Sequence, residues 1–162
     1  MPDATRLKAI QGYLKRGWYV IPLCWPSAGE CGCGRGHTGK EIGKAPLLGS
    51  GYQNRRSTES DVNEWWTRWP DANIGILLEP SGLLVIDCDG VEALREARLF
   101  GLPEGPVVRS GNGVHIYYKA GDATGRATKQ GNSHAIDVLA SGFVVAPPSR
   151  HRNGHTYEWR RS

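Results

Sequence analysis

The 162-residue chain has no long hydrophobic segment and few cysteines, and both absences limit where the protein can act. No run of about eighteen apolar residues is present, so we expect no membrane span. The first residues also lack the basic and apolar pattern of a secretory leader. The four cysteines are therefore expected to be thiols or metal ligands in a reducing compartment. Together these absences predict a soluble cytoplasmic protein without a membrane partner.

The composition excludes disordered, collagen-like and coiled-coil proteins. Hydrophobic residues make up 39% of the chain and charged residues 22%, close to globular averages. The 22 glycines and 10 prolines favour many turns and argue against a helical bundle. A chain of this length fits one compact domain.

Acidic residues are scarce in the last third of the chain. Residues 109–162 contain eight basic and three acidic residues, whereas residues 1–108 contain twelve and thirteen. Four of the five histidines also lie in the basic region. This charge suggests a phosphate-rich partner such as nucleic acid or a nucleotide, although a similar excess occurs on ordinary surfaces.

The hydrophobic pattern predicts three helices among many short strands. Helices are expected over residues 4–15, from the Thr58/Asp61 capping-box pattern to Pro70, and over residues 91–99. Strands are expected over residues 18–23, 73–78, 83–87, 107–108, 114–118, 135–139, 143–146 and 156–159, the second and third as a hairpin-like pair. Residues 24–43 are predicted to form a long loop. This irregular mixture favours an α+β domain over a doubly wound sheet.

The strongest single feature is a pair of acids at the end of an apolar strand. Because side chains alternate along a strand, Asp87 and Asp89 should project to one face and Cys88 to the other, where its thiol is expected to be buried. Two neighbouring carboxylates repel unless a cation lies between them, and oxygen ligands suit Mg²⁺ or Mn²⁺. The simpler alternative is that Asp89 only caps the following helix.

Two further features could serve the same chemistry. Glycines in the segment 109–115 would let backbone amides approach an anion, and Arg109, Ser110 and His115 could add donors to a triphosphate; the alternative is an ordinary glycine turn of a hairpin. Asp137 lies between apolar residues of a predicted strand. It would either pair with a nearby basic side chain or supply a third carboxylate to a two-metal centre.

The loop of residues 24–43 contains a second set of metal-ligand types. Cys24, Cys31, Cys33 and His37 have the ligand chemistry of a closed structural Zn²⁺ site. Their spacing differs from the usual pair of Cys-x₂-Cys knuckles, and reduced surface thiols are the alternative. We expect zinc because a loop this long and this rich in glycine has little else to order it.

A series of motifs follows in a fixed order along nearly the whole chain. They are Gly17-Trp18, Gly43–Pro46, Trp65–Gly75, Val85–Gly90, Ser110–His115, Ile136-Asp137, Val145–Ser149, His151 and Tyr157–Trp159. In this order they resemble the bifunctional DNA primase/polymerase (prim-pol) domain of the archaeo-eukaryotic primase superfamily, found in phage and plasmid replication proteins. The order is far more specific than any one motif.

The resemblance implies a catalytic core with an RNA-recognition-like antiparallel sheet and a small packed α/β module. It implies one catalytic domain over residues 1–162, with the cysteine loop inserted into it. This domain is expected to be the N-terminal part of a larger replication protein, with a helicase as a possible partner on the same full-length chain. A bacterial host cell, with a phage- or plasmid-borne gene, is the expected setting.

The resemblance also assigns expected roles to individual residues. Asp87, Asp89 and Asp137 match the family's metal-binding acids, and His115 matches its nucleotide-binding histidine. Ser110 would contact the triphosphate, and Lys44 would contact a phosphate or the template. The chain departs from the family at Leu139-Ala140, where many relatives have Arg-Gly.

The leading hypothesis is therefore a template-directed nucleotidyltransferase that uses (d)NTPs, a primer and a single-stranded DNA template. Two Mg²⁺ or Mn²⁺ ions would act at the three acids. A basic template track is expected at Arg126, Lys129, Arg150 and Arg152. Two other classes remain open: a non-catalytic, zinc-containing module that binds single-stranded nucleic acid, and a metal-dependent phosphoesterase.

Overall fold

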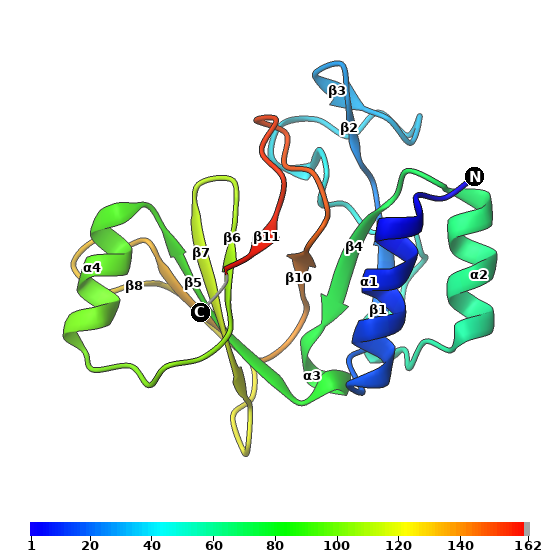
Figure 1. The fold of residues 1–162 in the computed structure, drawn as a ribbon. Helices are drawn as coiled ribbons and strands as arrows, with labels where there is room; N and C mark the ends of the chain where they lie inside the picture. The colour runs from blue at the N-terminus through cyan, green and yellow to red at the C-terminus, as the bar shows by residue number, and fades with distance from the viewer. Residues whose placement is uncertain (161–162) are drawn as a thin grey trace.

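The computed structural model describes residues 1–160 as a six-stranded and a three-stranded antiparallel sheet with helices packed against them, and a separate two-stranded hairpin. Figure 1 shows α4 beside the larger sheet in one lobe, and α1 and α2 beside the smaller sheet in the other. The expected α+β class is confirmed. Within residues 1–160, no helix is both long enough and apolar enough to cross a bilayer.

The larger sheet has six strands and holds the acids in its middle. Its spatial order is β11-β6-β7-β5-β9-β8, with every pairing antiparallel. The bounds are β5 Leu83–Asp89, β6 Val107–Arg109, β7 Gly113–Lys119, β8 Arg126–Gln130, β9 Ile136–Leu139 and β11 Glu158–Trp159. Strand β9 lies beside β5, so a late strand pairs with the first, as in a split β-α-β sheet.

Helix α4 (Val91–Leu99) covers one face of this sheet. A small buried cluster joins Ala93 and Ala97 of α4 to Ile86 and Cys88 of β5. The opposite face of the sheet turns toward the second lobe. Asp87 and Asp89 lie on this opposite face, because they alternate with Ile86 and Cys88 along the strand.

The second lobe is a three-stranded sheet in the order β1-β4-β10, flanked by α1 and α2. The bounds are α1 Ala4–Lys15, β1 Val20–Leu23, α2 Glu59–Arg68, β4 Asn73–Leu77 and β10 Phe143–Ala146. Every residue of the central strand β4 is buried. The predicted capping box is confirmed: the Thr58 side chain accepts from the Asp61 amide, and the Asp61 carboxylate accepts from the Thr58 amide.

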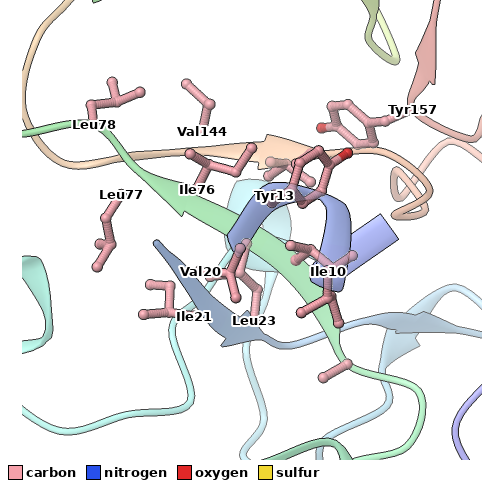
Figure 2. Close-up of a cluster of buried hydrophobic side chains, with 14 of the residues drawn as sticks. Ile10, Tyr13, Val20, Ile21, Leu23, Ile76, Leu77, Leu78, Val144 and Tyr157 are labelled. Carbon is pink, nitrogen blue, oxygen red and sulfur yellow. The ribbon is translucent and has the colours of Figure 1, made fainter. Parts of the chain in front are cut away.

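One continuous hydrophobic cluster connects the two sheets. It contains Val20, Ile76 and Val144 of the smaller sheet together with Val85 and Tyr117 of the larger one. Figure 2 shows side chains of α1, β1 and β4 meeting in the part of this cluster that belongs to the second lobe. The face of the larger sheet that carries the acids is therefore held in place by packing against the second lobe.

The structure corrects one expectation from the sequence and adds one strand that the sequence analysis did not predict. Strands β4 and β5 do not form a hairpin: they belong to different sheets, and the short helix α3 (Leu78–Ser81) connects them. Each strand is central in its own sheet and already pairs with a strand on both sides, so neither has a free edge with which the other could pair. Strand β8 was not expected, because its five residues are all exposed and carry no apolar alternation.

The loop of residues 24–43 also contains local order. It forms a small hairpin, β2 (Pro26–Ser27) with β3 (Glu30–Cys31), and a 3₁₀ turn, η1 (Gly39–Glu41). A second 3₁₀ turn, η2 (Tyr52–Asn54), precedes α2. The hairpin projects from the edge of the second lobe (Figure 1).

Candidate active site and metal centre

Three of the predicted site residues lie in one row across three neighbouring strands. Asp87 of β5 pairs in register with His115 of β7 on one side and with Asp137 of β9 on the other. Directly paired residues of antiparallel strands project to the same face of the sheet. We call this surface, which carries Asp87, Asp89, Asp137 and His115, the acidic face.

Cys88 separates the two acids of β5 and points the other way. Its side chain is fully buried in the cluster under α4, as strand alternation predicts. Burial is the main cause that raises the pKa of this thiol to about 11, and the negative charges of Asp87 and Asp89 raise it further. Cys88 is thus a neutral core residue and takes no part in the chemistry of the acidic face.

Asp87 lies in an environment that disfavours its negative charge. Burial is the largest cause that raises its pKa to about 7, and the charges of Asp89 and Asp137 add to the shift. Its Oδ1 atom is buried and has no hydrogen-bond partner within the described chain. A buried carboxylate oxygen without a donor, facing two further carboxylates, has the chemistry expected of a divalent-cation ligand.

His115 is buried beside this carboxylate and stays neutral near pH 7. Its Nε2 atom lies 3.6 Å from Asp87 Oδ1, and its buried Nδ1 has no partner among residues 1–160. Burial lowers the pKa of His115 to about 4, and the positive charge of Lys44 acts in the same direction. A neutral imidazole can donate one hydrogen bond to a ligand and accept another.

Asp137 is held by the bulge in the neighbouring edge strand. The backbone amide of Lys129 donates to Asp137 Oδ1 over 2.9 Å. The register of β8 shifts between Ala127 and Gln130, and Lys129 adopts a positive φ of 54° there. Arg126, on the same strand, carries a positive charge that lowers the pKa of Asp87. Strand β8 therefore orients Asp137 through a backbone amide and places the positive charge of Arg126 near Asp87.

The turn before β7 is built by packing as well as by hydrogen bonds. Ser110 Oγ accepts from the Gly113 amide, and the Ser110 amide donates to the Gly113 carbonyl. A Cβ atom at Gly113 would lie 1.8 Å from the carbonyl oxygen of Cys88, and one at Gly111 would lie within 2.5 Å of the His151 ring. Close backbone and ring contacts thus require both glycines, whether or not an anion binds at the turn.

The side chain of Arg109 leaves strand β6 on the opposite face of the sheet from the side chain of His115. It pairs with Val114, whose side chain is buried under α4, whereas its neighbour Val108 pairs with His115. The side chain of Arg109 is exposed. The structure therefore brings Ser110 close to the acidic face through the turn but does not bring Arg109 there.

Lys44 approaches the acidic face from the other lobe. Its charge lowers the pKa of Asp87 and depresses those of His115 and His151. Two contacts hold the loop around it: the Gly43 amide donates to Cys24 Sγ, and the Cys24 amide donates to the Ala45 carbonyl. The exposed ammonium group of Lys44 is thus supported by a fixed backbone.

Sequence reasoning assigned no role to Asn73, which ties the Lys44 loop to the C-terminal loop. Its fully buried side chain donates to the carbonyls of Gly43 and Arg150 and accepts from the Arg150 amide. Its place in the Trp65–Gly75 motif, at the start of an apolar strand, is the signal that the sequence offers. Two further neighbours of the site were also unassigned: Tyr157, whose ring centroid lies 6.1 Å from that of His115, and His151.

The four predicted zinc ligands converge in the structure. One ligand atom from each of Cys24, Cys31, Cys33 and His37 lies within 4.8 Å of all the others, and no other set within residues 1–160 gathers in this way. Burial by itself would raise the pKa of Cys31, but hydrogen bonds with Cys33 and His37 outweigh it and lower the pKa to about 6. We call this group the Cys₃His cluster.

The ligand atoms of the cluster would have to move slightly apart to hold a tetrahedral zinc ion. Cys31 Sγ lies 2.9 Å from Cys33 Sγ and 3.2 Å from His37 Nδ1. Tetrahedral thiolate ligands of zinc are roughly 3.7 Å apart, given Zn–S bonds of about 2.3 Å. An N–H···S contact such as that from Gly43 to Cys24, at 3.1 Å, is a suitable outer contact for a metal-bound thiolate.

Comparison with known protein families agrees with these observations. Residues 10–162 match the family of bifunctional DNA primase/polymerase N-terminal domains, Prim-Pol. The chain belongs to this family. The match covers nearly the whole chain, including both sheets, the Cys₃His cluster and the acidic face. No curated protein matches the chain closely enough to serve as a named relative.

Proposed function

We propose that this Prim-Pol domain is a template-directed nucleotidyltransferase that extends a primer with (d)NTPs on a single-stranded DNA template. One observation carries the proposal: Asp87, with a buried oxygen that lacks a donor among residues 1–160, lies between Asp137 and His115 on the central strands. Such an arrangement is costly unless cations are bound there. Residues 1–162 would act as one catalytic domain.

Asp87, Asp89 and Asp137 would hold two Mg²⁺ or Mn²⁺ ions. Ions in this position supply charge stabilisation for the leaving pyrophosphate and lower the pKa of the primer 3′-hydroxyl. The protein's part is to fix the carboxylates. The sheet register places Asp87 and Asp137, and the Lys129 amide orients the latter.

His115, Ser110 and Lys44 would position the incoming triphosphate. His115 is neutral at physiological pH, so it can donate a hydrogen bond without repelling the bound cations. The hydroxyl of Ser110 still has its proton free to donate, because Oγ accepts from Gly113. Lys44 would add a positive charge from the second lobe. Catalysis would then come mainly from positioning and charge stabilisation.

The template would follow exposed basic residues around the acidic face. Arg126 and Lys129 lie on the edge strand β8, and Arg150 and Arg152 lie in the loop beside His151. Contacts of this kind bind the phosphate backbone without reading sequence and weaken as salt is added. Arg109 has no part in the proposal, because it starts on the α4 face.

The Cys₃His cluster would hold one structural Zn²⁺. All four positions of a tetrahedral ion would be filled by protein, which leaves no open position for catalysis. The cluster's backbone contacts lead through Gly43 to Lys44. Zinc would therefore order the loop that presents Lys44 to the nucleotide.

Primer extension with an Asp87→Ala variant tests the proposal. The wild-type chain should lengthen a labelled primer on a template with Mg²⁺ or Mn²⁺, and Asp87→Ala should lower the rate by at least about 100-fold. The exposed Asp122, in the loop between β7 and β8, provides the control, and Asp122→Ala should extend normally. Undiminished synthesis by Asp87→Ala would contradict the proposal. Shortened primers would indicate a phosphoesterase, and a bound but unchanged primer would indicate a binding module.

A further inference from the structure

A pocket separate from the acidic face lies between α1 and the C-terminal strand β11. Its volume is about 500 Å³, within the range of small-molecule sites. Its lining includes Trp18 and Trp159, together with Gly12 and Tyr13 of α1. In Figure 1 the two elements that bound it, α1 and β11, belong to different lobes. Neither the predicted site residues nor the proposed template track uses this pocket.

The aromatic wall of the pocket is held rigid by hydrogen bonds and stacking. Trp159 Nε1 donates to Tyr13 Oη over 3.0 Å, and Tyr13 Oη donates to the Pro147 carbonyl over 2.6 Å. Trp18 stacks on Tyr13 with ring centroids 6.0 Å apart and an interplanar angle of 22°. A fixed aromatic wall binds a flat ligand without a large loss of side-chain entropy.

The charges at the pocket have one sign. Lys8 of α1 and Arg16, the residue that caps the C-terminal end of α1, both line it, and both are exposed. The Arg16 guanidinium lies 5.8 Å from the centroid of the Trp18 ring. The residues that line the pocket include no acid. This combination of aromatic faces and cations is complementary to a flat group joined to an anion.

The pocket is connected to the acidic face through one buried side chain. Tyr117 contacts both tryptophans, with ring centroids 5.7 Å from Trp18 and 5.0 Å from Trp159. It lies two residues after His115 on β7 and therefore on the same face of the sheet. Two residues of a strand span roughly 6.6 Å. A strand of nucleic acid that reaches the acidic face can therefore reach the pocket with few nucleotides.

We propose that this pocket binds one base of a single-stranded nucleic acid, stacked against Trp18 or Trp159, with a neighbouring phosphate at Lys8 and Arg16. Stacking on aromatic side chains beside a basic track is how proteins bind single strands without sequence preference. An extended peptide would suit the aromatic wall but would gain nothing from the two cations. The proposal rests on the proposed function only in identifying the strand as the template.

A variant that fills the pocket provides the main test. A Cβ atom at Gly12 would meet only Arg16 Nη1 within 4 Å, at 3.9 Å, so a larger side chain has room to enter the pocket. Leucine is also a good helix former, which should preserve α1. Gly12→Leu should weaken binding of fluorescein-labelled (dT)₁₂ about ten-fold in anisotropy measurements. Gln11→Leu, at an exposed neighbouring position that does not line the pocket, should leave affinity unchanged.

These measurements are made on the zinc-loaded full chain without added Mg²⁺, Mn²⁺ or nucleotide, so that binding is separated from catalysis. Asp122→Ala, at an exposed acid that does not line the pocket, should bind (dT)₁₂ as the wild type does. An oligomer of the same length with abasic sites should bind the wild type about as weakly as (dT)₁₂ binds Gly12→Leu. Equal affinity of Gly12→Leu and wild type, or of abasic and (dT)₁₂ strands, would overturn the proposal.

Charge reversal on α1 gives a second, independent readout. Lys8→Glu and Arg16→Glu should each reduce the dependence of (dT)₁₂ affinity on salt concentration by about one phosphate contact. Lys15→Glu makes the same charge change on the same helix outside the pocket, and it should reduce that dependence less. If the three variants behave alike, or if a polyproline peptide displaces (dT)₁₂ from the wild type, the assignment to a nucleic-acid strand is wrong.

Discussion

The two candidate metal-binding groups of this protein are built in opposite ways. Asp87 and Asp137 are placed by the hydrogen-bonded register of three strands, and their side chains spread over one face of the sheet. The Cys₃His cluster is drawn from a loop with little regular structure, yet its four ligand atoms converge within 4.8 Å. From this difference we expect the sheet to hold the acids in place without an ion and the loop to depend on one.

Removing a cluster ligand should have the largest effect on stability. Cys31→Ser is expected to release zinc and to cost about 3 kcal/mol or more, because the folding of such a loop is coupled to metal binding. In thermal unfolding this corresponds to a fall in Tm of roughly 10 °C. Zinc content, measured on the purified protein, should drop from about one per chain to near zero.

The buried thiol of Cys88 supplies the matched control for this variant. Cys88→Ala should keep its zinc, because this residue lies under α4 and away from the cluster. Asp87→Ala should also keep it. Wild-type protein without zinc, or a Cys31→Ser variant as stable as the wild type, would show that the loop is held by packing alone.

The acids should behave differently, since removing a charge from the sheet relieves repulsion. Burial, and then the charges of Asp89 and Asp137, raise the pKa of Asp87 in the folded protein to about 7, so the folded protein keeps this proton to higher pH than the unfolded chain. Its contribution to stability is present at low pH and is lost as the pH rises from about 4 to about 7. At pH 8, in buffer without Mg²⁺ or Mn²⁺ and without a chelator, Asp87→Asn should therefore be more stable than the wild type by about 2 kcal/mol.

Urea unfolding at several pH values measures this difference. The gap between Asp87→Asn and the wild type should close toward pH 4, where the wild-type carboxyl is protonated in the folded protein. The lowered pKa of His115 works in the opposite direction but is present in both proteins, so it largely cancels. A gap that is independent of pH would contradict the account of Asp87.

Lys44 connects the two groups, and its loss should have the smallest effect. Lys44→Ala should raise KM for the nucleotide about ten-fold, the size expected for one hydrogen bond to a charged group. Lys40→Ala, at an exposed position of the same loop, should change KM little. Cys31→Ser, assayed where it remains folded, should raise KM in the same direction as Lys44→Ala. An unchanged KM in Lys44→Ala would separate the loop from nucleotide binding.

Much of the site could be predicted from the sequence because strand alternation is a local rule. It placed Asp87 and Asp89 on one face and Cys88 on the other, and the residue types alone indicated the Cys₃His cluster. The start of α2 also followed from its capping box.

What the sequence could not show depends on contacts between distant segments. The pairing of Asp87 with both His115 and Asp137 is a property of sheet register, which no local pattern specifies. The same holds for Arg109, which falls on the α4 face, and for Asn73, which joins residues 30 and 77 positions away. The assignment of β4 and β5 to different sheets likewise follows from their other partners.

A metal-specificity switch at Asp89 tests most directly whether the acidic face holds the catalytic ions. Asp89 is exposed, so Asp89→Cys should fold, and a thiolate is a poor ligand for Mg²⁺ but a better one for the softer Mn²⁺. In Mg²⁺, the rate of primer extension by Asp89→Cys should be about 100-fold below that of the wild type. Replacing Mg²⁺ with Mn²⁺ should raise the rate of Asp89→Cys by about ten-fold or more. The same replacement should raise the rate of Asp89→Ala by no more than it raises that of the wild type. Equal losses for Asp89→Cys in both ions would contradict the assignment of Asp89 as a metal ligand.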